Sequence, residues 1–86
     1  MQLKDTVEMM NSEDFKERFK AEYYQLLFRL NTLTCMLNKW KNNTLDFEPK
    51  CSKETLENQV LFMQGYIGIL RLRAEIEGID LYYTNH

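Results

Sequence analysis

The sequence predicts an all-α fold, an antiparallel two-helix hairpin preceded by a short N-terminal helix. Apolar residues recur at alternating steps of four and three in two long segments, which is the spacing of one face of a helix. A proline-containing stretch separates these two segments. Only three glycines and one proline occur in the 86 residues, too few for the many turns of an all-β domain. The length allows one small domain.

The same patterns divide the chain into three parts. Leu3, Val7 and Met10 are spaced by four and three residues, which favours a short helix before the hairpin. The expected parts are an N-terminal helix or arm over 1–11, a helical hairpin domain over 12–81 and a tail over 82–86. Apolar residues that can dock onto the hairpin follow the second long helix, but the sequence does not specify their path.

The first long helix is predicted to begin after Ser12 and to end around Asn42. Ser12 is a favourable N-cap residue, and Glu13 and Asp14 follow in the first turn, where the helix dipole favours acidic side chains. The apolar seam of this helix consists of Phe15, Phe19, Tyr23, Leu26, Leu30, Leu33, Leu37 and Trp40. About 30 residues at roughly 1.5 Å each predict a helix about 45 Å long.

A turn and a second long helix follow. Pro49 ends regular structure in the turn, where Leu45 and Phe47 are expected to fold back onto the helix ends. Ser52 is the predicted N-cap of the second helix, and Gly78 is the residue predicted to end it. The seam of the second helix consists of Leu56, Val60, Met63, Ile67, Leu70 and Ala74.

Both helices carry more apolar residues than two packed helices can cover. Phe62, Tyr66 and Ile69 form a second stripe on the second helix, turned away from its seam. The extra residues are Tyr24, Leu27, Phe28, Met36, Leu61, Phe62, Tyr66, Ile69, Leu72 and Ile76. Large exposed apolar patches normally mark interfaces, so we expect an obligate homo-oligomer of hairpins. The alternative is a monomer in which the N-terminal helix covers the excess.

The composition argues against several classes of function. A net charge of −2 lacks the basic surplus that binding to DNA or RNA polymers requires. No run of about 18 apolar residues occurs, so we expect no membrane-spanning segment. The first residues carry charges and no apolar core, so we expect no signal peptide and a cytoplasmic location.

The nucleophilic and metal-binding side chains are few. Cys35 and Cys51 are expected to be free thiols in a reducing compartment. His86 is the only histidine, so neither a zinc site nor a catalytic triad is available, and we expect no cofactor. No general acid–base pair is identifiable, and Glu22 is expected to form a salt bridge with Arg18 or Arg29. An enzyme is therefore the least favoured function.

Three cations lie near the start of the first long helix. Lys16 and Lys20 share a face, whereas Arg18 points elsewhere. They are either solvated charges among acidic neighbours or an anion site, helped by the free N–H groups and the dipole of the helix start.

The second helix holds the other candidate binding residues. Gly65 and Gly68 each weaken the helix, which either permits close helix packing or leaves room for a flat base beside Tyr66. Gln59 is a candidate for contacts to a base edge. Two arginines on different faces, Arg71 and Arg73, are candidates for gripping phosphates at a subunit boundary. One of these two is expected to face solvent or to pair with Glu75 or Glu77.

A family resemblance adds to these residues. The chain reads ERFKAEYYQLLFRL over 17–30, TLDFEPKCS over 44–52 and SKETLENQVLFMQGYIGILRLRAEIEGIDL over 52–81. It thereby resembles the small hairpin proteins of phages, including crAss-like phages, that form the anti-CBASS and anti-Thoeris sponge family. The resemblance covers 12–81. The residues that match the family pattern are Arg18, Phe19, Lys20, Leu56, Gln59, Met63, Tyr66, Leu70 and Arg71.

The resemblance implies a helical homo-oligomer, hexameric in known family members. It also implies sequestration of cyclic di- and trinucleotide messengers without degradation, in the host cytoplasm if the protein is phage-encoded. Lys20 matches a family lysine that contacts cyclic dinucleotide phosphate, and Arg71 falls near a region used for cyclic trinucleotides. A stacking aromatic near the N-terminus of one member has no counterpart here, because the equivalent place falls near Asp5.

The sequence therefore supports two main hypotheses. The first is an oligomer that sequesters cyclic nucleotides, with the ligand-binding residues Lys16, Arg18, Lys20, Gln59, Tyr66, Arg71 and Arg73. The second is a structural or protein-binding hairpin that inhibits a host protein through its apolar face.

Overall fold

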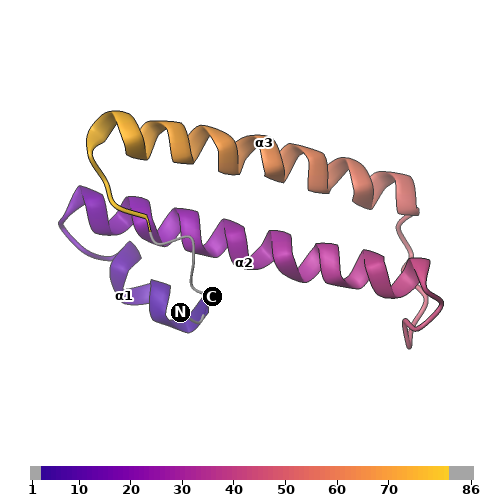
Figure 1. Ribbon diagram of the computed structural model, residues 1–86. Helices are drawn as coiled ribbons and strands as arrows, with labels where there is room; N and C mark the ends of the chain where they lie inside the picture. Colours follow the sequence, from indigo (N-terminus) through magenta and orange to yellow (C-terminus); the bar gives the residue numbers. More distant parts are fainter. Residues whose placement is uncertain (1–2, 82–86) are drawn as a thin grey trace.

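The computed structural model describes residues 3–81, and these residues form helices and loops without a strand. A 3₁₀ turn, η1 (Leu3–Asp5), leads into α1 (Thr6–Met10), and two long helices follow, α2 (Phe15–Lys41) and α3 (Lys53–Glu77). Figure 1 shows α2 and α3 side by side and antiparallel, with α1 against the first half of α2. This arrangement confirms the predicted all-helical hairpin. The predicted tail, 82–86, lies outside the described residues.

The first long helix begins three residues after the predicted cap. Asp14 has an extended backbone, and its carboxylate accepts a hydrogen bond from the Lys16 N–H at 2.9 Å. The hydroxyl of Ser12 instead accepts from the Asp14 N–H at 3.0 Å, so Ser12 shapes the loop before the helix. The prediction that Ser12 is the N-cap is therefore wrong, whereas the end of α2 at Asn42 is confirmed.

The two predicted ends of α3 are confirmed. The Ser52 hydroxyl accepts a hydrogen bond from the Thr55 N–H at 3.1 Å, which satisfies one of the free donors of the first turn. At the other end, Gly78 adopts a left-handed conformation with φ of 69°, and the Ile79 N–H then donates to the Ala74 carbonyl at 2.8 Å. This turn directs the following residues back across α2, where Ile79 and Leu81 are buried.

The apolar core lies in the half of the hairpin remote from the turn. Tyr23 and Leu70 are fully buried at its centre. The buried apolar residues are Phe19, Ala21, Tyr23, Leu30, Ile67, Leu70, Ala74, Ile79 and Leu81. These come from the first part of α2, the second part of α3 and the segment after Gly78, whereas the seam residues nearer the turn, such as Leu37 and Leu56, are only partly buried. The two predicted seams therefore face each other, with unequal burial along their length.

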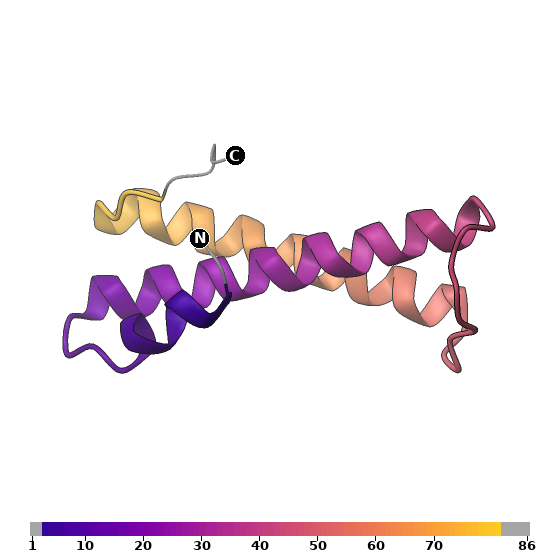
Figure 2. The same cartoon turned by 90° about the horizontal axis from the view of Figure 1, so that it is seen from below.

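The N-terminal helix packs on α2. Thr6 is buried, its hydroxyl donates to the Leu3 carbonyl at 2.6 Å, and the same hydroxyl accepts from the Gln25 side chain at 2.8 Å. In Figure 2 α1 lies along the first half of α2, and the helix–helix contacts of α1 are with α2. The expectation that a short helix precedes the hairpin is confirmed, but α1 does not cover the excess apolar residues of α3.

The part of the α3 surface that is not packed into the core is apolar and exposed, and is here called the outer face. Its large side chains are between 45% and 79% exposed. The outer face consists of Leu61, Phe62, Gly65, Tyr66, Gly68, Ile69, Leu72 and Ile76. The expectation that a lone hairpin leaves apolar area in water is confirmed for the described residues.

Replacing Leu70 by alanine is expected to lower the free energy of unfolding by about 2–5 kcal/mol, because the side chain is fully buried and its removal leaves a cavity. Urea unfolding followed by circular dichroism measures the change. The control is Val7→Ala on α1, where the side chain is 56% exposed and we expect a change within about 0.5 kcal/mol. Equal costs for both variants would contradict the position of the core.

Candidate functional site

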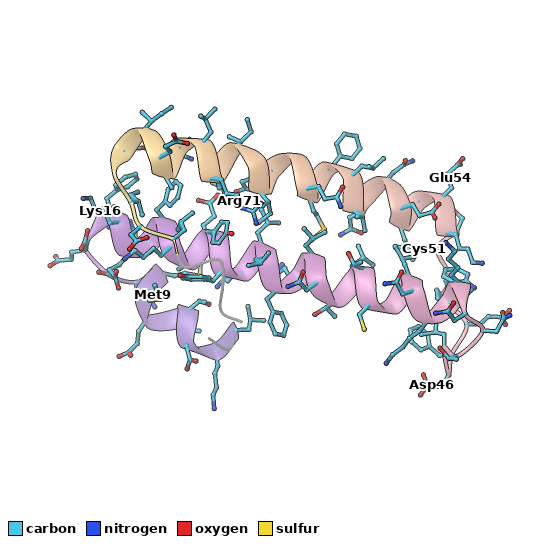
Figure 3. The ribbon with its side chains drawn as sticks, viewed as in Figure 1. Met9, Lys16, Asp46, Cys51, Glu54 and Arg71 are labelled. Atoms are coloured by element: carbon cyan, nitrogen blue, oxygen red, sulfur yellow. The ribbon has the colours of Figure 1, made fainter. Side chains whose placement is uncertain are left out.

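The three candidate cations of α2 have different environments. The carboxylate of Asp14 caps the helix start, so the chain itself supplies an anion there. Arg18 donates from Nη1 to the Ser12 carbonyl at 2.8 Å, which ties it to the preceding loop. Lys20 Nζ lies 3.7 Å from Glu17 Oε2, and 25% of its side chain is exposed. Lys16 is exposed at the start of α2, at the end of the hairpin that is remote from the turn (Figure 3).

Both arginines of α3 lie against aromatic rings of α2. The Arg71 guanidinium lies 5.9 Å from the centroid of the Tyr23 ring, and its Nε donates to the Tyr23 hydroxyl at 3.2 Å. The Arg73 guanidinium lies 4.9 Å from the centroid of the Phe19 ring, within the range of cation–π attraction. It also pairs with Glu77 at 3.9 Å, as the sequence predicts. A guanidinium has five N–H donors, so it can bond to more than one acceptor at a time.

Tyr66 connects the two helices through its hydroxyl. The hydroxyl donates to the Glu22 carboxylate across the hairpin. The predicted salt bridge of Glu22 with Arg18 or Arg29 is not formed among residues 3–81. Glu22 therefore accepts a hydrogen bond from the uncharged Tyr66 hydroxyl instead of pairing with an arginine, and this bond holds the Tyr66 ring at the edge of the hairpin.

A shallow groove on α3 brings two of the predicted residues together. It has a volume of about 410 Å³ and offers aromatic rings beside side-chain amides. The groove is lined by Thr55, Asn58, Gln59, Phe62, Met63 and Tyr66. Rings and amides of this kind can stack on a nucleobase and bond to its edges, as the sequence analysis expects of Tyr66 and Gln59.

The predicted residues are distributed over two edges of the hairpin. Gln59, Tyr66 and Arg73 are each seven residues apart, so they share one stripe along α3. Arg71 is five residues from Tyr66, a rotation of about 140° around the helix at 3.6 residues per turn. In Figure 3 its side chain points from α3 toward α2. One protomer therefore does not gather all seven predicted residues in one cavity.

Sequence reasoning missed a second set of grooves along α2. One groove, of about 820 Å³, lies between α2 and the turn and includes Phe28, Met36, Leu45 and Phe47. A neighbouring groove, of about 340 Å³, also contains Phe28 and Met36 and reaches Leu3. The apolar character of Phe28 and Phe47 was visible in the sequence, but their proximity depends on the path of the turn. Phe47 remains 55% exposed, so the turn folds back only in part.

The two glycines of α3 have no role inside the protomer. A Cβ atom added to Gly65 or Gly68 would meet no atom within 4 Å. Close packing against α2 therefore does not explain them. Both lie on the outer face, where the described chain places nothing against them.

Other chemistries find little support in the described part of the chain. Residues 3–81 contain no group of three or more His, Cys, Asp or Glu side chains arranged to hold a metal ion. Cys35 and Cys51 are exposed free thiols, as expected. None of the helices formed by these residues is both long and apolar enough to cross a bilayer.

Comparison with known proteins identifies the family. Residues 13–76, which span α2, the turn and nearly all of α3, match the family model described as Sequestin. The chain belongs to the Sequestin family. Membership in the Sequestin family indicates a sequestering rather than a catalytic role, with a small molecule as the implied ligand. No curated protein and no solved structure matches the chain.

Tyr23→Phe and Arg71→Met are expected to be energetically coupled. Each removes one partner of the bond between the buried Tyr23 and the exposed Arg71. We expect each single variant to lower the free energy of unfolding by about 1 kcal/mol, and the double variant by less than the sum. A double-mutant cycle by urea unfolding measures the coupling, and strictly additive costs would show that the contact contributes nothing.

Proposed function

We propose that this Sequestin-family protein binds cyclic di- or trinucleotide messengers and sequesters them without cleavage. In this proposal it is a phage immune-evasion protein directed against CBASS or Thoeris defence, acting in the host cytoplasm. The observation that carries the proposal is the match of 13–76 to the Sequestin family. The paired cationic and aromatic side chains at the hairpin edges support it, because a cyclic nucleotide presents phosphates beside flat bases.

Cationic side chains bind phosphates, whereas aromatic rings and amides bind bases. We assign phosphate binding to Lys20 and Arg71, with Lys16, Arg18 and Arg73 as further cations. Arg71 suits this role because the Tyr23 ring and hydroxyl hold its guanidinium in one orientation, which lowers the entropy lost on binding. We assign base contacts to Tyr66 and Gln59 in the shallow groove of α3.

Assembly into a homo-oligomer, for which a hexamer is the expected size, is part of the same proposal. The outer face leaves six large apolar side chains about half or more exposed. At about 25 cal/mol per Å², leaving some 500 Å² of apolar surface in water forfeits roughly 12 kcal/mol. Association of copies removes this cost and brings cations from several chains to common boundaries.

The exposed outer face also favours a second function. A helix that presents apolar side chains at steps of three and four can dock into a groove of another protein. In this alternative the hairpin inhibits a host protein through its apolar face, and the cations have no ligand. Calorimetry with a panel of cyclic di- and trinucleotides separates the two functions, because only the first gives heat of binding.

Lys20→Glu is expected to weaken cyclic nucleotide binding more than tenfold, because the substitution replaces an attraction to phosphate by a repulsion. Isothermal titration calorimetry measures the dissociation constant, and light scattering checks that the mass is unchanged. Lys39→Glu makes the same change in charge near the other end of α2 and serves as the control. If both variants bind equally well, Lys20 is a solvated surface charge.

The ligand is expected to leave the protein chemically unchanged. After incubation and heat denaturation, chromatography and mass spectrometry should recover the intact cyclic nucleotide in the amount that was added. The control is the same ligand incubated without protein. Linear nucleotide products above that control would refute sequestration and identify an enzyme.

Ile69→Asp is expected to break the assembly, because it places an unpaired carboxylate in an apolar contact. Ile69 is 56% exposed in the protomer, so the substitution leaves the core of the hairpin unaltered. Light scattering measures the mass, and circular dichroism measures the helix content. Asn31→Asp, at an exposed position of α2, adds the same charge as a control. An unchanged mass for Ile69→Asp would exclude the outer face as an interface.

A further inference from the structure

The outer face of α3 contains a stripe whose residue order is symmetric. Leu61, Gly65, Gly68 and Leu72 follow one another at steps of four, three and four. Read from either end of the helix, this Leu-Gly stripe presents a leucine, two glycines and a leucine at the same spacings. Leu61 and Leu72 are 63% and 52% exposed, and the space above both glycines is open.

The glycines weaken α3 without any compensation inside the protomer. Glycine is less favourable than alanine in a helix interior, and an alanine Cβ would fit at either position without a contact inside 4 Å. A glycine pair in the middle of a helix face allows a second backbone to approach closely. No contact within the protomer therefore requires glycine at these two positions. The requirement comes from a contact outside the protomer, on the side of α3 that faces away from α2.

The size and charge of the outer face fit a protein surface rather than solvent. Its six large side chains leave on the order of 500 Å² of apolar surface in water, more than half of the about 800 Å² that each partner contributes to a standard interface. The segment 58–70, NQVLFMQGYIGIL, contains no charged residue. Charge is depleted in the same way at the centre of protein–protein interfaces.

A second copy of the chain fits this surface better than an unrelated partner does. A two-fold interface uses the same patch on both subunits, so the patch must be complementary to itself. We propose that α3 packs antiparallel against α3 of a second copy, with the two-fold axis beside Gly65 and Gly68. This arrangement brings Leu61 of each copy toward Leu72 of the other. It also sets the positive N-terminal end of each helix dipole beside the negative C-terminal end of the other.

The same contact extends the ligand site across two chains, a step that rests on the proposed function. In an antiparallel pair, the two-fold axis is perpendicular to the helices. The edge of one outer face therefore lies beside the same edge of the other. Arg73 lies on the same stripe as Phe62 and Tyr66. Arg73 of the second copy therefore approaches the shallow groove beside Phe62 and Tyr66, and it adds a guanidinium to a surface that holds rings and amides. Each α3 pair then forms two equivalent sites for a nucleotide phosphate with its base.

The first test uses the glycines and needs no ligand. The wild-type protein is expected to have twice the chain mass of 10.4 kDa, or a larger even multiple of it, in light scattering at micromolar concentration. The Cβ atom of Gly68→Leu would meet no protomer atom within 4 Å, but its side chain would block the crossing, so the mass should fall by at least half while the helix content is kept. Gln64→Leu introduces the same side chain beside the outer face and should leave the mass unchanged. A wild-type monomer, an odd multiple or an unaltered Gly68→Leu mass would overturn the contact.

The second test determines the relative direction of the two helices. In a background with Cys35→Ser and Cys51→Ser, which removes both exposed thiols, Leu61→Cys and Leu72→Cys are made separately. Antiparallel packing predicts that the two variants form a disulfide with each other when mixed, at least tenfold faster than either does with itself. Faster pairing of each variant with itself would show parallel packing and overturn the proposal.

The third test separates the interface from the ligand site. Arg73→Gln should weaken cyclic nucleotide binding about tenfold while the mass and the cross-linking pattern stay as in the wild type. Loss of binding by the Gly68→Leu variant, together with its fall in mass, would show that the site spans two chains. If no cyclic nucleotide binds the wild type and the cross-linking is antiparallel, the sequestering function fails and the interface stands. Cyclic nucleotide binding at full affinity by a monomeric Gly68→Leu variant would refute the shared site alone.

Discussion

The structure depends on one constraint: apolar side chains lie on most sides of α3, but among the described residues α2 is the long helix that packs against it. Only one side of α3 packs on α2, where Ile67, Leu70 and Ala74 are buried. The other sides carry apolar side chains of comparable size that are 45–79% exposed in the described residues. Two packed helices of this length offer no second layer, because α1 lies on α2 instead. The outer face is therefore a property of the fold, and residues 3–81 leave it uncovered.

The cations of the candidate site follow from the same packing. The aromatic residues Phe19 and Tyr23 are buried in the seam of α2, yet their rings still reach Arg73 and Arg71 at the hairpin edges. Core and site thus share side chains. The fold itself therefore orients the two guanidinium groups, and we expect a change in the core to alter their orientation.

Much of the fold could be predicted from residue spacing, and the reasons are local. The seams that contain Tyr23 and Leu70 follow from helical periodicity, and the ends of α3 follow from the preferences of Ser52 and Gly78. The start of α2 could not be decided in this way, since Ser12 and Asp14 are both good caps and the loop geometry chooses between them. The contact of Arg71 with Tyr23 depends on the rotation and register of two helices, which one sequence does not specify. The grooves around Phe28 depend on the path of the turn for the same reason.

The uneven distribution of buried residues along the hairpin has a dynamic consequence. Cooperative protection against amide hydrogen exchange follows buried apolar contacts, and these lie in the half remote from Pro49. The turn half of α2 and α3 should therefore open and close locally while the other half stays folded. Fluctuations near Phe47 would let the α2 grooves widen or narrow around a bound molecule. The opposite end of the hairpin, which holds Arg71 and Arg73, should stay rigid. Burial therefore leads us to expect one flexible end and one rigid end in a molecule whose longest extent is 43 Å.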